Sequence, residues 1–195
     1  NPAIILADGV IGQMMEKVVL PEQRTRLTDE EVIARCPWAT TGRTHHRTPN
    51  IITSLELDPA EMEKRNIHLQ KKYAEIEENE VRFEELHCED AEYLIVAFGS
   101  CARIAQKAME MAREEGIKVG LLRPITLWPF PSKAIAARAA QVKGILTVEL
   151  NAGQMVEDVR LAVECKVPVE HFGRLGGIVP DPDEVITALK EKLIK

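Results

Sequence analysis

The sequence lacks the features that mark membrane proteins and nucleic-acid-binding proteins. No apolar run approaches the roughly 18–20 residues that a membrane-spanning helix needs. The 195 residues carry a formal charge of −6, which provides no basic surface for nucleic acid or for an anionic membrane. We therefore expect neither kind of partner.

The chain also lacks paired cysteines. Its four cysteines are scattered, and none forms a C-x-x-C pair: Cys36, Cys88, Cys101 and Cys165. This spacing argues against a zinc or iron–sulfur site within the chain and is typical of a cytoplasmic protein. Cys101 is expected near a helix N-terminus, where the pKa of a thiol falls, but it also lies on an apolar stripe. We interpret it as a core residue.

Several nucleotide and hydrolase motifs are missing. There is no P-loop and no G-x-S-x-G elbow, and the segment FGSCA at 98–102 is not a G-x-G-x-x-G fingerprint. An initiator methionine is missing as well, since the sequence opens with Asn1-Pro2 and enters an apolar run at once. We interpret Ala3–Ala7 as the last strand of something longer and the chain as a fragment.

What the sequence does contain is a clear βαβ pattern from Tyr93 to Pro131. Residues 94–97 are apolar without alternation, as in a strand that is buried on both faces. Ser100 is placed to cap a helix with a 3.6-residue apolar stripe, and Gly116 ends that helix. A second strand begins at Val119. Parallel strands need a crossover of this kind.

The C-terminal region continues the alternation of helices and strands. A helix capped by Ser132 and ended by Gly144 is expected at 132–142, a second at 155–165, and a third at 182–193 after the helix start Asp181-Pro182-Asp183-Glu184. Strands are expected at 145–150 and 167–172. The last of these strands contains Pro168, so we expect it at a sheet edge. The pattern predicts an α/β fold with a doubly wound, mostly parallel sheet over residues 91–195.

A connector with one long helix precedes the sheet. Residues 20–57 contain prolines and little periodicity, and are expected to be irregular. Asp58-Pro59-Ala60-Glu61 is a capping-box-like helix start worth about 1 kcal/mol, and the helix should run to near Leu86 on a heptad stripe. The narrow stripe indicates an arm that lies across another domain or subunit, with a coiled coil as the alternative.

A small basic cluster lies within this connector, formed by Arg43, His45, His46 and Arg47. Four such groups could hold a phosphate or a neighbour's carboxylates. The histidine pair also suggests a metal, but no third ligand lies at a suitable spacing. A solvated loop is the interpretation that we favour.

Candidate site residues follow from the rule that α/β sheets bind ligands at the carboxyl ends of their strands. The residues predicted to lie at this edge of the sheet, and so to border a site, are Asp8, Gln13, Arg123, Glu149, Asn151 and Gln154. Asp8-Gly9 is also compatible with a plain strand-to-helix turn, which composition favours. Arg123 and Glu149, if on neighbouring strands, would form either a structural ion pair or part of a cofactor edge.

Three sequence segments together resemble a known protein family: ILADGVIGQMME at 5–16, LLRPITLWPFP at 121–131 and VELNAGQMVEDV at 148–159. They resemble the C-terminal portion of the alpha subunit of 2-oxoacid:ferredoxin oxidoreductases, most closely the 2-ketoisovalerate (branched-chain) type. Residues 52–73 also look like the linker of that subunit, and the similarity covers essentially the whole chain.

The resemblance implies three parts. Residues 1–20 would be the tail of a truncated thiamine-pyrimidine-binding domain, residues 21–90 a linker with a helical arm, and residues 91–195 a transketolase C-terminal-like domain. The motifs with the catalytic glutamate would precede Asn1, so no catalytic residue and no metal ligand is expected here.

The resemblance also implies cofactors and partners. Thiamine diphosphate with magnesium would be bound by the complete complex, mainly outside this chain, and coenzyme A would be a cosubstrate. Beta, gamma and ferredoxin-like delta subunits would be partners, some carrying iron–sulfur clusters, and ferredoxin would accept electrons. The fragment alone is expected to be inactive. Two alternatives remain: the domain of another thiamine enzyme (dehydrogenase E1 beta or transketolase-like), and a non-catalytic interaction module.

Overall fold

The computed structural model describes residues 2–38 and 52–194. They fall into two compact units, one made of residues 1–14 and 71–195 and the other of residues 15–70. The basic cluster of Arg43, His45, His46 and Arg47 lies outside the described residues, so its interpretation stays a prediction.

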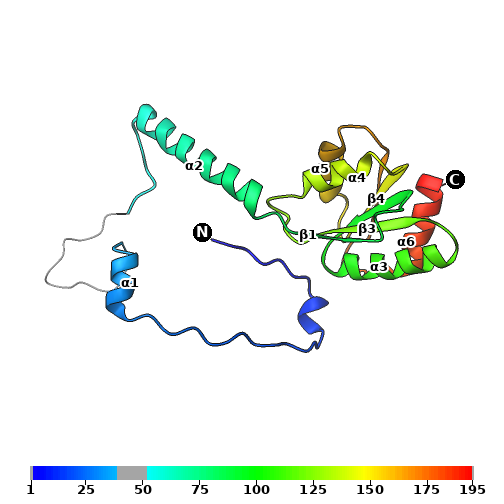
Figure 1. Cartoon of the computed structure of the whole chain (residues 1–195), viewed down its shortest axis with the longest axis horizontal. Coiled ribbons are helices and arrows are strands. Elements are labelled where there is room, and N and C mark those ends of the chain that lie inside the picture. Colours follow the sequence, from blue (N-terminus) through cyan, green and yellow to red (C-terminus); the bar gives the residue numbers. More distant parts are fainter. Residues whose placement is uncertain (1, 39–51, 195) are drawn as a thin grey trace. The chain divides into compact units, whose positions relative to one another are not determined.

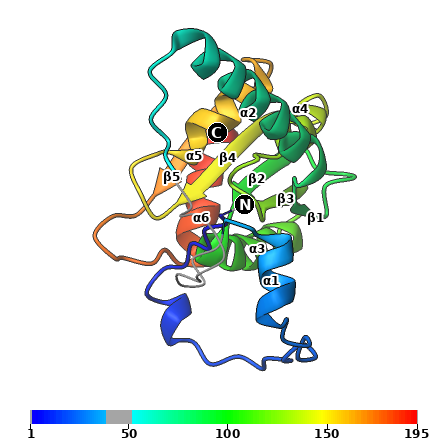
Figure 2. The same cartoon turned by 90° about the vertical axis from the view of Figure 1, so that its left-hand side faces the viewer.

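A five-stranded sheet forms the centre of the larger unit, in the order β1-β3-β2-β4-β5 (Figure 2). Its strands are β1 (Phe83–Leu86), β2 (Tyr93–Ala97), β3 (Val119–Pro124), β4 (Gly144–Glu149) and β5 (Val169–Gly173). Strands β2 to β5 run parallel, and β1 pairs antiparallel with β3. The predicted edge position of the strand after Pro168 is confirmed.

Helices cover both faces of this sheet, as Figure 1 shows. They are α3 (Gly99–Glu114), α4 (Ser132–Ala139), α5 (Met155–Val163) and α6 (Pro182–Leu189), the last extended by a π-helical turn over Lys190–Ile194. Helix α3 packs with α6, and α4 packs with α5. The α/β, doubly wound, mostly parallel fold is therefore confirmed.

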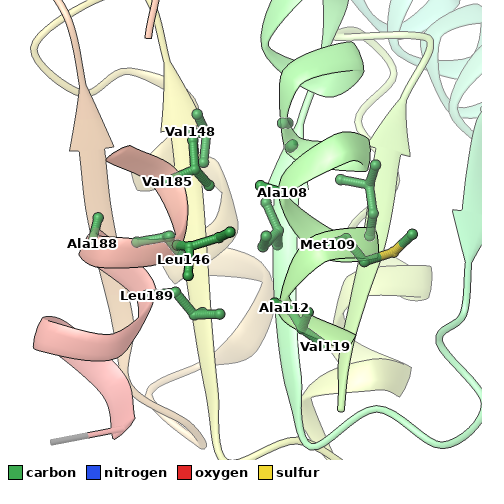
Figure 3. Close-up of a cluster of buried hydrophobic side chains, with 14 of the residues drawn as sticks. Ala108, Met109, Ala112, Val119, Leu146, Val148, Val185, Ala188 and Leu189 are labelled. Carbon is green, nitrogen blue, oxygen red and sulfur yellow. The ribbon is translucent and has the colours of Figure 1, made fainter. Parts of the chain in front are cut away.

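The core consists of two apolar layers separated by the sheet. One layer joins α3 and α6 to the sheet, with Met109, Leu146 and Leu189 among its buried side chains (Figure 3). The side of α3 that faces the sheet carries Ala105, Ala108 and Ala112, and these small residues let the helix backbone approach the strands. The second layer lies under α4 and α5.

Two predicted helix caps are wrong and two are confirmed, one of them at Asp58, whose carboxylate accepts the Ala60 N–H at 2.8 Å and the Glu61 N–H at 3.2 Å. Helix α3 begins at Gly99 after an N-cap residue, Phe98, that makes no side-chain cap bond. Ser132 is the first residue of α4 and not its cap. Asp181 caps α6 as expected, because its carboxylate accepts the Glu184 N–H at 2.8 Å in a reciprocal capping box.

The long helix is shorter than the sequence predicts. Helix α2 spans Pro59–Asn79, and residues 83–86 form β1 instead of its last turn. Phe83 and Leu86 fit the heptad stripe, but β3 has a free edge whose backbone groups pair with this segment. Tertiary pairing therefore overrides the local pattern.

Two helix ends were also predicted too late. Helix α5 stops at Val163 because Glu164 and Cys165 have φ angles of 50° and 60°, which an α-helix cannot continue. Helix α4 ends at Ala139, not Val142, and Gly144 belongs to β4 rather than ending the helix.

The predicted strand at Ala3–Ala7 is wrong. Among the described residues this segment has no strand partner, and a strand forms only when a neighbour supplies its ladder of hydrogen bonds. Its end makes a turn and a 3₁₀ helix at Ile11–Gln13.

In the unit of residues 15–70, the connector is not wholly irregular. Asp29–Arg35 forms α1, capped by Thr28 and Glu31 in a capping box. The Thr-Asp-Glu-Glu sequence carries that signal. Within the described parts of the chain, no helix combines the length and apolar character needed to cross a membrane.

Candidate functional site

A cavity of about 120 Å³ lies at the carboxyl ends of the two central strands, β2 and β4. From β2 the chain passes to β3 on one side, and β4 then lies on the other side of β2. The cavity is thus at the topological switch point, where open α/β sheets bind ligands. Its third wall is the N-terminal segment around Asp8.

Glu149 ends β4 as a buried carboxylate that is 1% exposed. It accepts three backbone N–H groups of the following turn and helix: those of Gln154 at 3.1 Å, Met155 at 2.8 Å and Val156 at 3.0 Å. These are the donors that an α-helix leaves unpaired at its start. Glu149 therefore caps α5 from the preceding strand.

The predicted ion pair between Glu149 and Arg123 is wrong. Strand β2 lies between the strands that carry them. Arg123 Nη1 instead donates to Glu84 Oε2 at 2.8 Å, and both side chains are about half exposed. The two residues face each other in the register of β1 with β3. The sequence pattern does not reveal this pair, because the heptad stripe places residue 84 in the predicted long helix.

His171 on β5 is a neighbour of Glu149 that sequence reasoning missed. Its Nδ1 lies 3.4 Å from Glu149 Oε1 and 3.4 Å from Thr147 Oγ1, and its side chain is 22% exposed. Only the pairing of β4 with β5 brings these three residues together. No local motif signals that pairing.

Gly173, at the end of β5, allows the turn after β4 to approach closely. A Cβ atom there would lie 2.2 Å from the carbonyl oxygen of Asn151 and 2.7 Å from His171 Nε2. Asn151 Oδ1 accepts the Gly153 N–H at 2.7 Å, which holds the turn in shape. Asn151 is one of the residues that line the cavity.

Asp8 reaches the same cavity from the other end of the chain. Its Oδ2 accepts the Ser100 hydroxyl at 2.6 Å, and its Oδ1 accepts the Ile11 N–H at 2.8 Å. The Ser100 hydrogen bond, followed by that from Ile11, lowers the pKa of Asp8. Ser100 was predicted as a cap, and its side chain serves this contact instead.

The structure brings three of the six predicted residues to the cavity: Asp8, Glu149 and Asn151. Gln154 contributes its backbone N–H to Glu149. Gln13 and Arg123 are not among the lining residues. Whether any of the six contacts a cofactor stays a prediction.

The chemistry available at the cavity is limited. Cys101 lines it, but burial raises the pKa of that thiol to about 11, with the carboxylates of Asp8 and Glu149 adding to the rise. A thiol in this state is a poor nucleophile. Among the described residues, no three His, Cys, Asp or Glu side chains gather as a metal site needs. These residues therefore do not fit a magnesium–diphosphate group.

The fold and the switch-point cavity define a class, the transketolase C-terminal-like α/β domains. A split-gene transketolase, described as an inactive beta4 tetramer, matches with a TM-score of 0.50 and 21% identity, over 58% of this chain and 41% of that one. That likeness shows the fold alone.

A second solved structure is more similar. It is a 2-oxoglutarate:ferredoxin oxidoreductase from Magnetococcus marinus, described with 2-oxoglutarate, coenzyme A and succinyl-CoA bound. It matches with a TM-score of 0.64 and 26% identity, over 76% of this chain and 28% of that one. Residues 91–185 match the family described as pyruvate:ferredoxin oxidoreductase core domain II.

Curated relatives identify the group more narrowly. Ketoisovalerate oxidoreductase subunits VorB from Methanothermobacter marburgensis and Methanothermobacter thermautotrophicus are each 44% identical over 98% of this chain and 52% of their own length. The 2-oxoglutarate synthase subunit KorA of Archaeoglobus fulgidus is 31% identical over 93% of this chain and 51% of its own. The chain spans about half the length of these relatives.

The chain is a homologue of the VorB and KorA subunits of 2-oxoacid oxidoreductases, and its residues 91–185 match core domain II. The resemblance of the three sequence segments to the alpha subunit of 2-oxoacid:ferredoxin oxidoreductases is confirmed. The two alternatives, a different thiamine enzyme and a non-catalytic module, are not favoured.

Proposed function

We propose that this chain is the C-terminal portion of the alpha subunit of a thiamine-diphosphate-dependent 2-ketoisovalerate:ferredoxin oxidoreductase in the cytoplasm. The complete complex converts a 2-oxoacid and coenzyme A into an acyl-CoA and carbon dioxide, and passes two electrons to ferredoxin. The observation that carries the proposal is the 44% identity to two ketoisovalerate subunits, against 31% to a 2-oxoglutarate subunit.

The cofactors of this reaction are proposed to lie mainly outside the chain. We assign thiamine diphosphate and magnesium mainly to other parts of the complex, in keeping with described residues that form no cluster of metal-binding side chains. Iron–sulfur clusters are assigned to partner subunits for a related reason: the four cysteines carry no cluster-binding motif. Coenzyme A enters as a cosubstrate of the whole complex.

The role of this chain in the proposal is assembly and one wall of the active centre. Residues 1–20 end the pyrimidine-binding domain, residues 21–90 form the linker, and residues 91–195 form the transketolase-like domain. Its partners are the beta, gamma and ferredoxin-like delta subunits, with ferredoxin as the electron acceptor. Asp8, Glu149 and Asn151 are the residues of this wall that share the cavity.

The first experiment compares this chain alone with the complete alpha subunit coexpressed with its partner subunits. We expect the complete complex to reduce a viologen dye when 2-ketoisovalerate and coenzyme A are present. The isolated chain should give no reduction. Turnover by the isolated chain would overturn the assembly role, and a higher kcat/KM for 2-oxoglutarate or pyruvate would overturn the substrate assignment.

Copurification tests the partners. A tagged copy of this chain should retain the beta subunit after washing in moderate salt. A chain that elutes alone and monodisperse would contradict the proposed assembly and would favour the interaction-module alternative.

A further inference from the structure

A groove of about 790 Å³ lies between the end of α2 and the loop that follows β3. Its lining residues come from the end of α2, the start of β1, the loop after β3 and the start of α4. They are Glu77, Glu78, Val81, Phe83 and residues 128–134. We call this surface the Trp128 groove. It shares no lining residue with the switch-point cavity.

The groove presents aromatic side chains to solvent. Trp128 is 56% exposed, and Phe83 is exposed as well. The ring of Tyr73 on α2 meets that of Trp128 edge to face, with 5.8 Å between the ring centroids. Single exposed apolar residues are common on protein surfaces, but aromatic side chains grouped along a groove are typical of an interaction site.

Hydrogen bonds hold the walls of the groove together. The Thr126 hydroxyl accepts the Arg82 N–H at 3.0 Å and donates to the Pro129 carbonyl oxygen at 2.8 Å. The Ile125 N–H donates to the Arg82 carbonyl oxygen at 2.9 Å. The segment before β1 is thus joined to the loop that carries Trp128. A ligand would therefore meet a preformed surface and lose little affinity to the ordering of the loop.

The charge of the groove favours a cation. The last turn of α2 carries Glu77 and Glu78 and no basic residue, at the helix end where the backbone already places a partial negative charge. Lys133 forms an ion pair with Glu78 at 2.6 Å. Within the part of the chain that the structure describes, Glu77 has no ion-pair partner. One carboxylate of the groove is therefore available to a cationic ligand.

We propose that the Trp128 groove is a docking site for a partner polypeptide that inserts an arginine side chain. A guanidinium group stacks on the face of an indole ring, and its N–H groups pair with a carboxylate. Trp128 and Glu77 offer both complements within one groove. Val81 and Phe83 supply apolar surface for the methylene stem of the arginine. The partner's identity as another subunit of the complex rests on the proposed function, whereas the recognition of arginine does not.

A fluorescence titration of this chain tests the recognition of arginine. Trp38→Phe leaves Trp128 as the only tryptophan. The probe is an acetylated and amidated Leu-Arg-Leu tripeptide, compared with the same peptide in which neutral citrulline replaces arginine. We expect a saturable change in the Trp128 emission and roughly tenfold tighter binding of the arginine peptide. Glu77→Gln should remove this preference, and Glu157→Gln, at an exposed position of α5, should keep it. Equal binding of the two peptides to the Trp38→Phe chain, or binding of neither, would overturn the proposal.

Photocrosslinking in the complete complex identifies the occupant. Benzoylphenylalanine in place of Ser132, an exposed residue of the groove, should crosslink under ultraviolet light to an arginine-containing segment of another subunit. The same group in place of Leu161, exposed on α5, is the control and should not reach that segment. No crosslink from position 132, or one only to the alpha subunit itself or to a second copy of it, would overturn the docking of a partner. Because the titration needs no partner subunit, failure of the groove is distinguishable from failure of the proposed function.

Discussion

The carboxylate of Glu149, the last residue of β4, accepts the backbone N–H of Met155, the first residue of α5, at 2.8 Å. The connecting turn is therefore closed by a side chain of the strand, because the N-cap residue Gln154 makes no side-chain cap bond. This contact explains why a charged residue finishes an otherwise apolar strand. It stabilises the turn that carries Asn151 to the cavity.

Replacement of Glu149 tests this role. Glu149→Gln keeps the size of the side chain but leaves one acceptor oxygen for three N–H donors, so we expect a loss of about 2–4 kcal/mol in the free energy of unfolding. Urea denaturation followed by circular dichroism measures it. Glu157→Gln, on the exposed side of α5, should change stability by less than about 0.5 kcal/mol. Equal effects of the two substitutions would contradict the capping role.

Gly173 offers a steric test of the same turn. Gly173→Ala places a Cβ atom 2.2 Å from the Asn151 carbonyl oxygen, and the strand end must shift to relieve this overlap. We expect a loss of roughly 1–3 kcal/mol, as for other overpacked sites. Gly12→Ala is the control, because a Cβ atom there meets nothing within 4 Å. If Gly173→Ala left the free energy of unfolding unchanged, the end of β5 and the turn at Asn151 would be able to move apart without cost.

The sheet could be predicted from the sequence because its signals are local. Mostly apolar runs mark β2 and β4, and the capping box of Asp181 with Glu184 marks α6. Strand β1 could not be predicted, since its sequence, FEEL, alternates weakly and its partner lies about 40 positions away. Its strand conformation comes from the free edge of β3 and not from its own residues.

Only part of the candidate site could be predicted, because some of its contacts join residues that are distant in sequence. Asp8, Glu149 and Asn151 were found because each follows an apolar run, which is a local signal. His171 was missed because only the pairing of β4 with β5 brings it beside Thr147 and Glu149. Strand order also decides that Arg123 lies beside Glu84 and away from Glu149.

Acidification should release the N-terminal segment. The hydrogen bonds from Ser100 and Ile11 lower the pKa of Asp8 in the folded chain. A lowered carboxyl pKa gives stability that is present above the unfolded value, about 3.9, and is lost as pH falls through the folded value. We expect the Ser100 and Ile11 amide resonances to stay constant from about pH 7 to 5 and to shift only under more acidic conditions. The Asp8→Asn variant should show no such shift, and a midpoint above the ordinary aspartate value would contradict the expectation.

Arg123 should contribute little to stability. Its partner Glu84 is about half exposed, as is Arg123 itself, so solvent screens the ion pair and the coupling energy should be below about 1 kcal/mol. A double-mutant cycle of Arg123→Ala and Glu84→Gln measures it. In the complete complex, Arg123→Ala should leave kcat/KM unchanged, because Arg123 does not line the cavity. A large fall in kcat/KM without a loss of stability would return Arg123 to the candidate site.

The reactivity of the cysteines should follow their burial. Burial raises the pKa of Cys101 to about 11 and that of Cys88 to about 11, so at pH 8 only about one thiol in a thousand of either residue is a thiolate. Cys165 is exposed. Brief treatment of the folded chain with iodoacetamide, read by peptide mass spectrometry, should therefore modify Cys165 and leave Cys88 and Cys101 intact.

In guanidinium chloride all four cysteines should react, which controls for reagent access. Labelling of Cys101 in the folded chain as fast as Cys165 would contradict the burial of Cys101, which is 4% exposed.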